Sequence, residues 1–173
     1  MKTVLLGVTG SIASYKAADI ASKLTQQDYK VYTLLTENAK RFITPLTFEA
    51  LTGQEVFDDM FKERQTHISL AGEADLILVA PASACFISKL ASGIVSELLQ
   101  LTIISSSAPV LICPAMNENM YRNPIIKENI AKLKGYGYNF LDPGKGWLSC
   151  GHTGEGRLSD TKDILKKSLE LLR

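Results

Sequence analysis

The sequence lacks a long hydrophobic run and has almost no net charge. Nineteen Lys and Arg side chains face eighteen Asp and Glu side chains, which leaves a formal net charge of +1. This balance gives no indication of a nucleic acid or an anionic membrane as a partner. No apolar run reaches the length of a membrane span, and residues 1–4 have no signal-peptide layout. We therefore expect a cytoplasmic protein that acts on a small molecule.

Cysteine and histidine are scarce. The three cysteines, Cys85, Cys113 and Cys150, are an odd number without the spacing of a disulfide framework, so reduced thiols are expected. The only histidines, His67 and His152, have no metal-ligand spacing with the cysteines. The sequence therefore predicts no structural metal site.

What the sequence does contain is an alternation of apolar runs and helical patterns. The runs at 3–8, 30–35, 75–80, 109–113 and 138–141 are typical of strands, and the continuous ones of parallel strands buried on both faces. Helical patterns cover 12–24, 36–43, 45–51, 87–101 with an interruption at Gly93, 124–134 and the segment from 159 to 173. This alternation predicts an α/β protein in which residues 1–173 form one domain.

The turn after the first strand, Thr9-Gly10-Ser11, leads into a helix. Backbone N–H groups at such a helix N-terminus bind phosphate, and the Ser11 hydroxyl can add a donor. The dinucleotide fingerprint G-x-G-x-x-G is absent, because Gly7 and Gly10 have the wrong spacing, so one phosphate fits better than a pyrophosphate. In a doubly wound sheet, Thr36 after the second strand could reach the same phosphate. The alternative is that Ser11 only caps the helix.

Two later strands end in proline followed by small or polar residues. The first exit is Pro81-Ala82-Ser83-Ala84-Cys85-Phe86, where small residues would let a flat ligand lie close to the backbone, or would only allow tight helix packing. The second is Pro114-Ala115-Met116-Asn117-Glu118-Asn119-Met120-Tyr121. If this stretch forms a helical turn, Met116 and Met120 share one face, and the Asn117 amide lies at the ligand-binding end of the sheet. The alternative is that Asn117 caps a helix and the methionines fill the core.

Residues 142–157 are rich in glycine and contain Cys150 and His152. They read as one long loop, and a loop of this length in a compact domain is usually functional or disordered.

Several of these features occur together in a known order. They are Gly7-Val8-Thr9-Gly10-Ser11-Ile12-Ala13, His67, Pro81-Ala82-Ser83-Ala84, Pro114-Ala115-Met116-Asn117 with Met120, and Ser149-Cys150-Gly151. In this order and spacing, the chain resembles the homo-oligomeric flavin-containing cysteine decarboxylases. The resemblance implies a single Rossmann-like (flavodoxin-like) doubly wound parallel sheet with helices on both faces. It also implies FMN as the cofactor, and trimers or dodecamers with sites between subunits.

The resemblance also implies roles for individual residues. Gly10, Ser11, Ile12, Thr36, Glu37 and Asn38 would surround the FMN phosphate and ribityl chain, while Phe42, Ser83, Ala84, Cys85 and Phe86 would line the flavin. Asn117, Met120 and Ser149 would contact the substrate: Asn117 would hold the carboxylate or the amide of the substrate, and Met120 would pack on the site. His67 would act as an acid–base group, since its usual pKa near neutrality suits that task.

The implied chemistry explains the presence of Cys150. A cysteine carboxylate has no electron sink for decarboxylation, whereas oxidation of its thiol gives a thioaldehyde that can accept the electrons. Loss of carbon dioxide then leaves an enethiol. Family members that act on peptides release this enethiol, whereas members that reduce it again need a proton donor, a role that Cys150 matches.

Two departures from the family pattern affect the flavin site. Cys85-Phe86 stands where the family usually has Asn-Thr, and Val95-Ser96-Glu97 stands where it has an Asp-Asn pair. We expect these changes to affect flavin affinity and redox tuning more than the fold. One hypothesis is that Phe86 stacks on the flavin ring and offsets the lost hydrogen bond. The departures also leave open a non-catalytic flavin-binding regulatory subunit.

Overall fold

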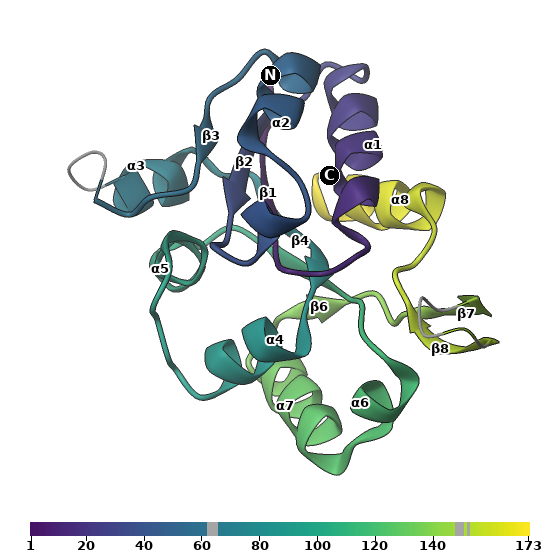
Figure 1. The fold of residues 1–173 in the computed structure, drawn as a ribbon. Coiled ribbons are helices and arrows are strands. Elements are labelled where there is room, and N and C mark those ends of the chain that lie inside the picture. Colours follow the sequence, from purple (N-terminus) through teal and green to yellow (C-terminus); the bar gives the residue numbers. More distant parts are fainter. Residues whose placement is uncertain (62–65, 148–150, 152) are drawn as a thin grey trace.

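The computed structural model describes residues 1–61, 66–147, 151 and 153–173. Its centre is a parallel sheet of six strands in the order β3-β2-β1-β4-β5-β6 (Figure 1). The strands are β1 (Thr3–Val8), β2 (Lys30–Leu35), β3 (Val56–Phe57), β4 (Leu76–Ala82), β5 (Val110–Pro114) and β6 (Asn139–Phe140). Every residue of β1, β4 and β5 is buried, as expected for parallel strands covered on both faces. This strand order confirms the predicted Rossmann-like, doubly wound fold.

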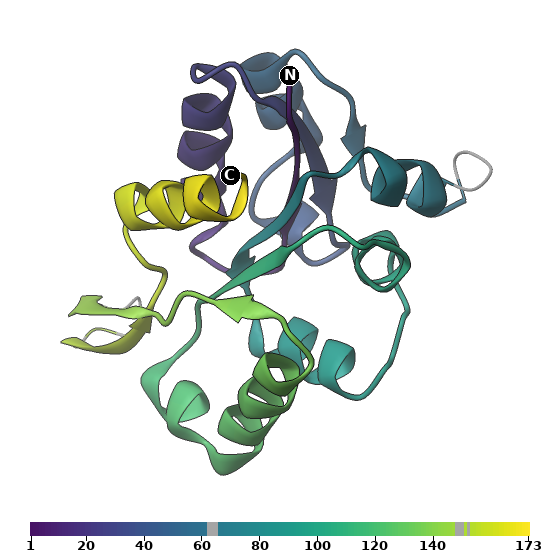
Figure 2. The same ribbon diagram turned by 180° about the vertical axis from the view of Figure 1, so that it is seen from behind.

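Helices cover both faces of the sheet, as Figures 1 and 2 show from opposite sides. One core cluster joins β1 to α1 (Ser14–Thr25), α2 (Pro45–Thr52) and α8 (Thr161–Leu171). The other cluster joins the opposite face to α3 (Thr66–Glu73), α4 (Ala84–Ala91), α5 (Leu98–Ser105) and α7 (Pro124–Gly135). Alternate residues of β1 take part in each cluster, because successive side chains of a strand point to opposite faces. No described helix is both long enough and apolar enough to cross a membrane.

The predicted helical region over 87–101 and its interruption at Gly93 are confirmed, but the two helices have other outer bounds. The structure divides this region into α4, which begins at Ala84, and α5, which extends to Ser105, with residues 92–97 between them. Gly93 adopts a left-handed conformation with a φ of 69° just after α4, so the helix ends there. The predicted helix over 36–43 is only the short 3₁₀ turn η1 (Ala39–Arg41). The sequence pattern also missed the two-residue strand β3.

The glycine-rich region after residue 141 is not simply a loop. It contains an antiparallel hairpin of β7 (Gly144–Trp147) and β8 (Thr153–Arg157), which lies outside the main sheet. The prediction that 138–141 is the last strand is therefore wrong, although β6 does form within it. A short helix, α6 (Glu118–Arg122), follows β5 and lies near this hairpin.

Candidate functional site

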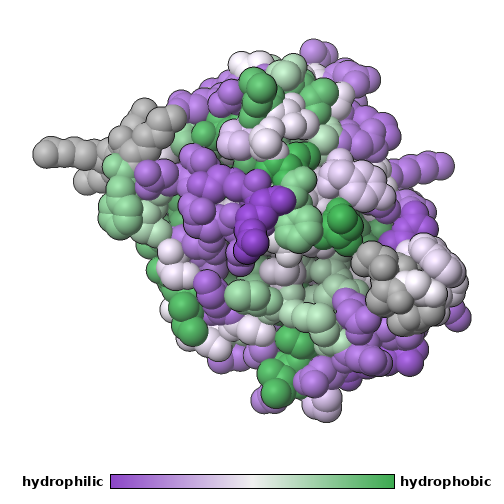
Figure 3. Space-filling view, in the orientation of Figure 1, coloured by the Kyte–Doolittle hydropathy of each residue, from purple (hydrophilic) through white to green (hydrophobic). Residues whose placement is uncertain are grey.

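A cavity of about 320 Å³, called cavity A below, lies at the carboxyl ends of β1, β2, β4 and β5. It is lined by Thr9, Gly10, Ser11, Thr36, Asn38, Ser83, Ala84, Cys85, Phe86, Lys89, Glu97, Ala115, Met116 and Met120. The strand order reverses between β1 and β4, and open α/β sheets bind ligands at such a point. The surface is hollowed in the middle of the face shown in Figure 3, beside a strongly hydrophilic area.

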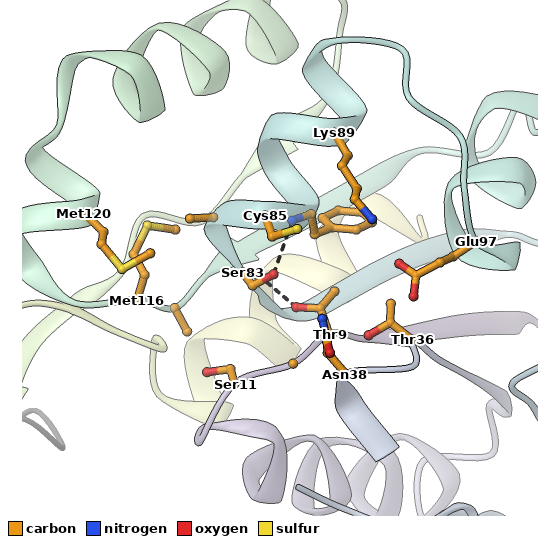
Figure 4. A pocket seen from close by; sticks show the side chains of 14 residues that line it. Thr9, Ser11, Thr36, Asn38, Ser83, Cys85, Lys89, Glu97, Met116 and Met120 are labelled. Carbon is orange, nitrogen blue, oxygen red and sulfur yellow. Dashed lines mark hydrogen bonds between the residues drawn. The ribbon is translucent and has the colours of Figure 1, made fainter. Parts of the chain in front are cut away.

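The floor of cavity A is fixed by the side chain of Thr9. Its hydroxyl donates to the carbonyl oxygen of Pro81 at 2.9 Å and accepts from the backbone N–H of Ser83 at 2.8 Å. The Ser83 hydroxyl in turn accepts from the N–H of Phe86 and caps α4 (Figure 4). The turn after β1 and the N-terminus of α4 are therefore held together, although the sequence separates them by more than 70 residues.

The turns after β1 and β2 also meet closely. A β-carbon on Gly10 would lie 2.5 Å from Cβ of Asn38, which is closer than such atoms approach in proteins. The Ser11 hydroxyl accepts from the N–H of Ala13 at 3.2 Å, and the Thr36 hydroxyl accepts from the N–H of Ala39 at 3.3 Å. The alternative that Ser11 caps the helix is wrong, because α1 begins at Ser14 with Ala13 as its N-cap and no side chain caps it. The Ser11 hydroxyl lines the cavity.

The two methionines and the charged side chains lie on opposite sides of cavity A (Figure 4). Met116 and Met120 lie on one side, while Lys89 and Glu97 lie on the other. The ammonium of Lys89 is 3.1 Å from the Ser96 hydroxyl, and the Glu97 carboxylate accepts from the backbone N–H of Glu37 at 3.1 Å. A ligand here would meet a soft apolar wall and a polar wall.

The Pro114–Tyr121 stretch combines both interpretations offered by the sequence. Helix α6 begins only at Glu118, so the expectation that Met116 and Met120 share a helix face is wrong. Both methionines nevertheless line cavity A. Asn117 is the N-cap of α6, and its Oδ1 accepts from the N–H of Asn119 at 2.8 Å.

A second cavity of about 320 Å³, called cavity B, adjoins cavity A and shares Ser11, Ala115 and Met116 with it. Its other lining residues are Ile12, Ala13, Tyr15, Lys16, Asn117, Trp147, Gly156, Arg157 and Leu158. Burial lowers the pKa of Lys16, and the positive charge of Arg157 lowers it further. The Asp160 carboxylate, 2.9 Å from Nη2 of Arg157, raises the pKa of Lys16 and offsets part of this effect. Two cations thus line one cavity, and an anionic group bound there would be attracted to both.

Most of the predicted site residues lie at these two cavities. Gly10, Ser11, Thr36, Asn38, Ser83, Ala84, Cys85, Phe86 and Met120 line cavity A, and Ser11, Ile12 and Asn117 line cavity B. Three do not line either cavity: Glu37, whose side chain pairs with Lys40, Phe42, which is half exposed, and His67, which is partly buried on α3. Ser149 and Cys150 lie outside the described residues.

Sequence reasoning missed several contributors to the cavities, among them the cations Lys89, Lys16 and Arg157. Lys89 lies four residues after Cys85 on α4, a spacing that places both on one helix face and could have identified it. Glu97 was linked to the flavin site only as part of a departure from the family pattern, and the break between α4 and α5 places it at cavity A. Lys16 and Arg157 come together only in the folded chain. Among the described residues, no group of three or more His, Cys, Asp or Glu side chains could hold a metal ion.

Comparison with known proteins gives consistent results. The profile of the family described as Flavoprotein matches residues 1–173. The coenzyme A biosynthesis bifunctional protein CoaBC of Bacillus subtilis is 48% identical over 169 residues, which cover 95% of this chain and 42% of that protein. The chain therefore spans about two fifths of the length of this relative. The probable phosphopantothenoylcysteine decarboxylase of Streptococcus mutans is 42% identical over 177 residues, covering 99% of both chains.

Solved structures resemble the fold over nearly the whole chain. A mutant PPC decarboxylase complexed with pantothenoylaminoethenethiol superposes with a TM-score of 0.86 at 27% identity, covering 96% of this chain and 95% of that one. The FMN-dependent cysteine decarboxylase SpaF also gives a TM-score of 0.86, at 25% identity, covering 99% and 97% of the two chains.

Proposed function

The chain belongs to the flavoprotein family, and from this premise we propose that it is an FMN-dependent decarboxylase of 4′-phospho-N-pantothenoylcysteine. Its product would be 4′-phosphopantetheine, in coenzyme A biosynthesis. The observation that carries the proposal is the joining of cavity A to cavity B, which is lined by the cations Lys16 and Arg157. A substrate that carries a phosphate at one end and a cysteine carboxylate at the other fits this combination. The names of the Bacillus and Streptococcus relatives support the same assignment.

Cavity A has the chemistry that FMN requires. Hydroxyl groups of Ser11 and Thr36 lie beside the N-terminus of α1, a twelve-residue helix, and helix N-termini attract phosphate. The close approach of Gly10 to Asn38 excludes any side chain at position 10 and brings the backbone of the two turns together. The same cavity offers hydroxyl, amide and sulfur side chains for the rest of the cofactor. These residues fit FMN, and we propose that they hold it, with Glu37, Ile12 and Phe42 at its edges.

When bound, FMN would take up two electrons from the substrate thiol and return them later. The thiol would lose two electrons and two protons to become a thioaldehyde, and the bond to the carboxylate would break to release carbon dioxide. The electron pair of that bond would remain in the enethiol. The residues of the chain bind and orient the substrate and move its protons.

Asn117 is the proposed holder of the substrate carboxylate. Its Oδ1 accepts from the N–H of Asn119, which fixes the rotation of the amide and assigns donation to a carboxylate to Nδ2. Met120 would pack against the reacting end of the substrate, and Ser149 would add a polar contact. For the reduction of the enethiol, Cys150 is the proposed proton donor.

His67 is the proposed acid–base group, and its location supports an oligomer. It lies on α3 and lines neither cavity of its own chain, next to Ile68, which is an exposed apolar residue. A site between subunits would let His67 of a neighbouring copy reach the substrate. We therefore propose a trimer, or a dodecamer built of trimers, located in the cytoplasm. Residues 1–173 would act as one flavoprotein domain.

The test is anaerobic incubation of the FMN-loaded protein with 4′-phospho-N-pantothenoylcysteine, with products identified by mass spectrometry. Wild type is expected to yield 4′-phosphopantetheine. Cys150→Ser is expected to accumulate the enethiol, which is two hydrogens lighter than 4′-phosphopantetheine, because the enethiol is then not reduced. Absence of carbon dioxide loss at full FMN occupancy would overturn the assignment, and would favour a non-catalytic flavin-binding subunit.

A second candidate is a peptide cysteine decarboxylase. Peptidyl-cysteine decarboxylase EpiD gives a TM-score of 0.86 at 26% identity, so the fold alone does not separate the two activities. Release of the enethiol by the wild-type protein from a peptide with a C-terminal cysteine would favour this candidate. Lys16 and Arg157 in cavity B favour the phosphorylated substrate.

A further inference from the structure

We propose that Glu118 is the positioning residue of the β7–β8 hairpin. Its carboxylate holds β8 against α6 and so keeps Trp147 and Arg157 in the wall of cavity B, where the phosphorylated substrate binds if the proposed function is correct. Glu118 itself lines neither cavity, so its effect on the substrate passes through the hairpin.

The hairpin needs such an anchor because it has little apolar support. None of the described residues of β7 and β8 belongs to either core cluster. The hairpin also forms a sheet of its own, with no ladder to the six-stranded sheet. Trp147, its one large apolar side chain among the described residues, is 69% exposed. Leu158, which follows β8, is buried in a core cluster and holds the base of the hairpin, so polar contacts are left to hold the strands themselves.

The carboxylate of Glu118 lies directly over the backbone of β8. Its Oε1 accepts from the N–H of Glu155 at 3.2 Å. A β-carbon on Gly154 would lie 2.6 Å from Oε2, so the absence of a side chain at position 154 is what admits the carboxylate. The Glu118 side chain is only 17% exposed, and a hydrogen bond to an ionised acceptor that is shielded from water is stronger than one between neutral groups.

Arg122 strengthens this contact from the next turn of α6. Its Nη2 lies 2.9 Å from Oε1 of Glu118, and its Nε lies 3.6 Å from Oε2 of Glu155. The guanidinium thus bridges a carboxylate of α6 and a carboxylate of β8. Because Arg122 is mostly exposed, we assign the larger part of the anchoring to Glu118.

A backbone contact fixes the register of the same junction. The N–H of Met116 donates to the carbonyl oxygen of Gly156 at 2.9 Å. Gly156 has a φ of 126°, and a β-carbon there would lie 2.2 Å from the carbonyl oxygen of Met116. Residues 116–118 therefore run closely past 154–156, and the anchor joins the hairpin to the segment that also supplies Asn117.

The single tryptophan provides a direct test, because Trp147 lies on β7 and reports the motion of the hairpin. We would measure the decay of its fluorescence anisotropy in wild type, Glu118→Ala, Glu118→Gln and Gly154→Ala. Glu118→Ala is expected to increase the amplitude of the fast decay. Gly154→Ala is expected to do the same, since its methyl group displaces the intact carboxylate. Glu118→Gln should recover part of the wild-type decay, because its amide oxygen can still accept from Glu155. Glu128→Ala, an exposed position on α7, is the control and should match wild type.

Catalysis provides the second readout. Glu118→Ala should raise the KM for 4′-phospho-N-pantothenoylcysteine about tenfold, which is the effect expected from the loss of one hydrogen bond to a charged group. The change in kcat should be smaller. An unchanged Trp147 decay in Glu118→Ala would overturn the anchor, and a changed decay with an unchanged KM would overturn its role in positioning. If wild type does not turn over the substrate, the proposed function fails, while the anisotropy comparison still decides whether Glu118 anchors the hairpin.

Discussion

The hydroxyl oxygen of Thr9 lies 2.8 Å from the backbone nitrogen of Ser83 and accepts a hydrogen bond from it. The same hydroxyl donates to Pro81, and Thr9 is 1% exposed. One buried side chain thus links the turn that follows β1 to the residue that caps α4. Both segments line cavity A, so the shape of the cavity depends on this link.

Thr9→Val tests that dependence. Valine keeps the branched shape but removes both hydrogen bonds, leaving the N–H of Ser83 and the carbonyl of Pro81 without this partner. We expect a loss of about 1–3 kcal/mol in the free energy of unfolding, measured by urea denaturation of the apoprotein. FMN affinity should fall as well, because the two loops are no longer held together.

Thr25→Val is the matched control for Thr9→Val. The Thr25 hydroxyl donates to the carbonyl of Ala21 within α1, and Thr25 lines neither cavity, so FMN affinity should stay at the wild-type value. Equal FMN affinity in Thr9→Val and Thr25→Val would show that the link does not shape the cofactor site.

Gly10→Ala should abolish FMN binding. The added β-carbon would lie 2.5 Å from Cβ of Asn38 and 3.2 Å from its backbone carbonyl carbon, so the two turns must separate. Gly72→Ala is the control, because a β-carbon at this exposed position of α3 meets nothing within 4 Å. That variant should gain about 0.5–1 kcal/mol in stability from its helix propensity. Fluorescence titration with FMN measures the cofactor affinity of the two variants, and urea denaturation measures their stability. Wild-type FMN affinity in Gly10→Ala would contradict the prediction.

Phe86→Thr separates packing from cofactor contact. Phe86 is 3% exposed and belongs to the core cluster beneath α4, although it also lines cavity A. Removing its ring should cost about 3–5 kcal/mol of stability even without FMN, as for other large-to-small core changes. If Phe86 also stacks on the flavin, the folded variant should bind FMN more weakly than Phe86→Leu does. Tighter FMN binding by Phe86→Thr would exclude stacking.

The sequence predicted the largely buried central strands and the amphipathic helix over 124–134, which is α7. Strands β1 and β2 have the predicted bounds, because a continuous apolar run has few alternatives to a central strand. The break between α4 and α5 was predicted from Gly93, but not the six-residue connection 92–97 that it opens. Apolar residues continue through Ile94 and Val95, and the helix ends because Gly93 turns left-handed.

The site was predictable where it follows a strand and unpredictable where it depends on tertiary structure. Ser83 and Asn117 follow strand exits, which parallel topology brings to one edge of the sheet. The sequence did not predict the β7–β8 hairpin, because its strands have no alternating apolar pattern. Its glycines at 154 and 156 instead let neighbouring residues approach the backbone closely. Distant segments bring Glu97 to the backbone of Glu37, and no local periodicity encodes such a contact.

Cys113 should make stability depend on alkaline pH. It is fully buried at the end of β5, and burial raises the pKa of its thiol well above the ordinary value of about 8.5. Above that value the unfolded chain releases a proton that the folded chain retains, so the free energy of unfolding falls as pH rises. The contribution should approach about 1.4 kcal/mol per pH unit, and Cys113→Ala should show a slope smaller by that amount in urea unfolding between about pH 9 and 10. Burial also raises the pKa of Tyr121, to about 12, but Tyr121 is present in both proteins and cancels in the difference. Identical slopes would mean that the thiol at position 113 ionises as readily in the folded chain as in the unfolded one.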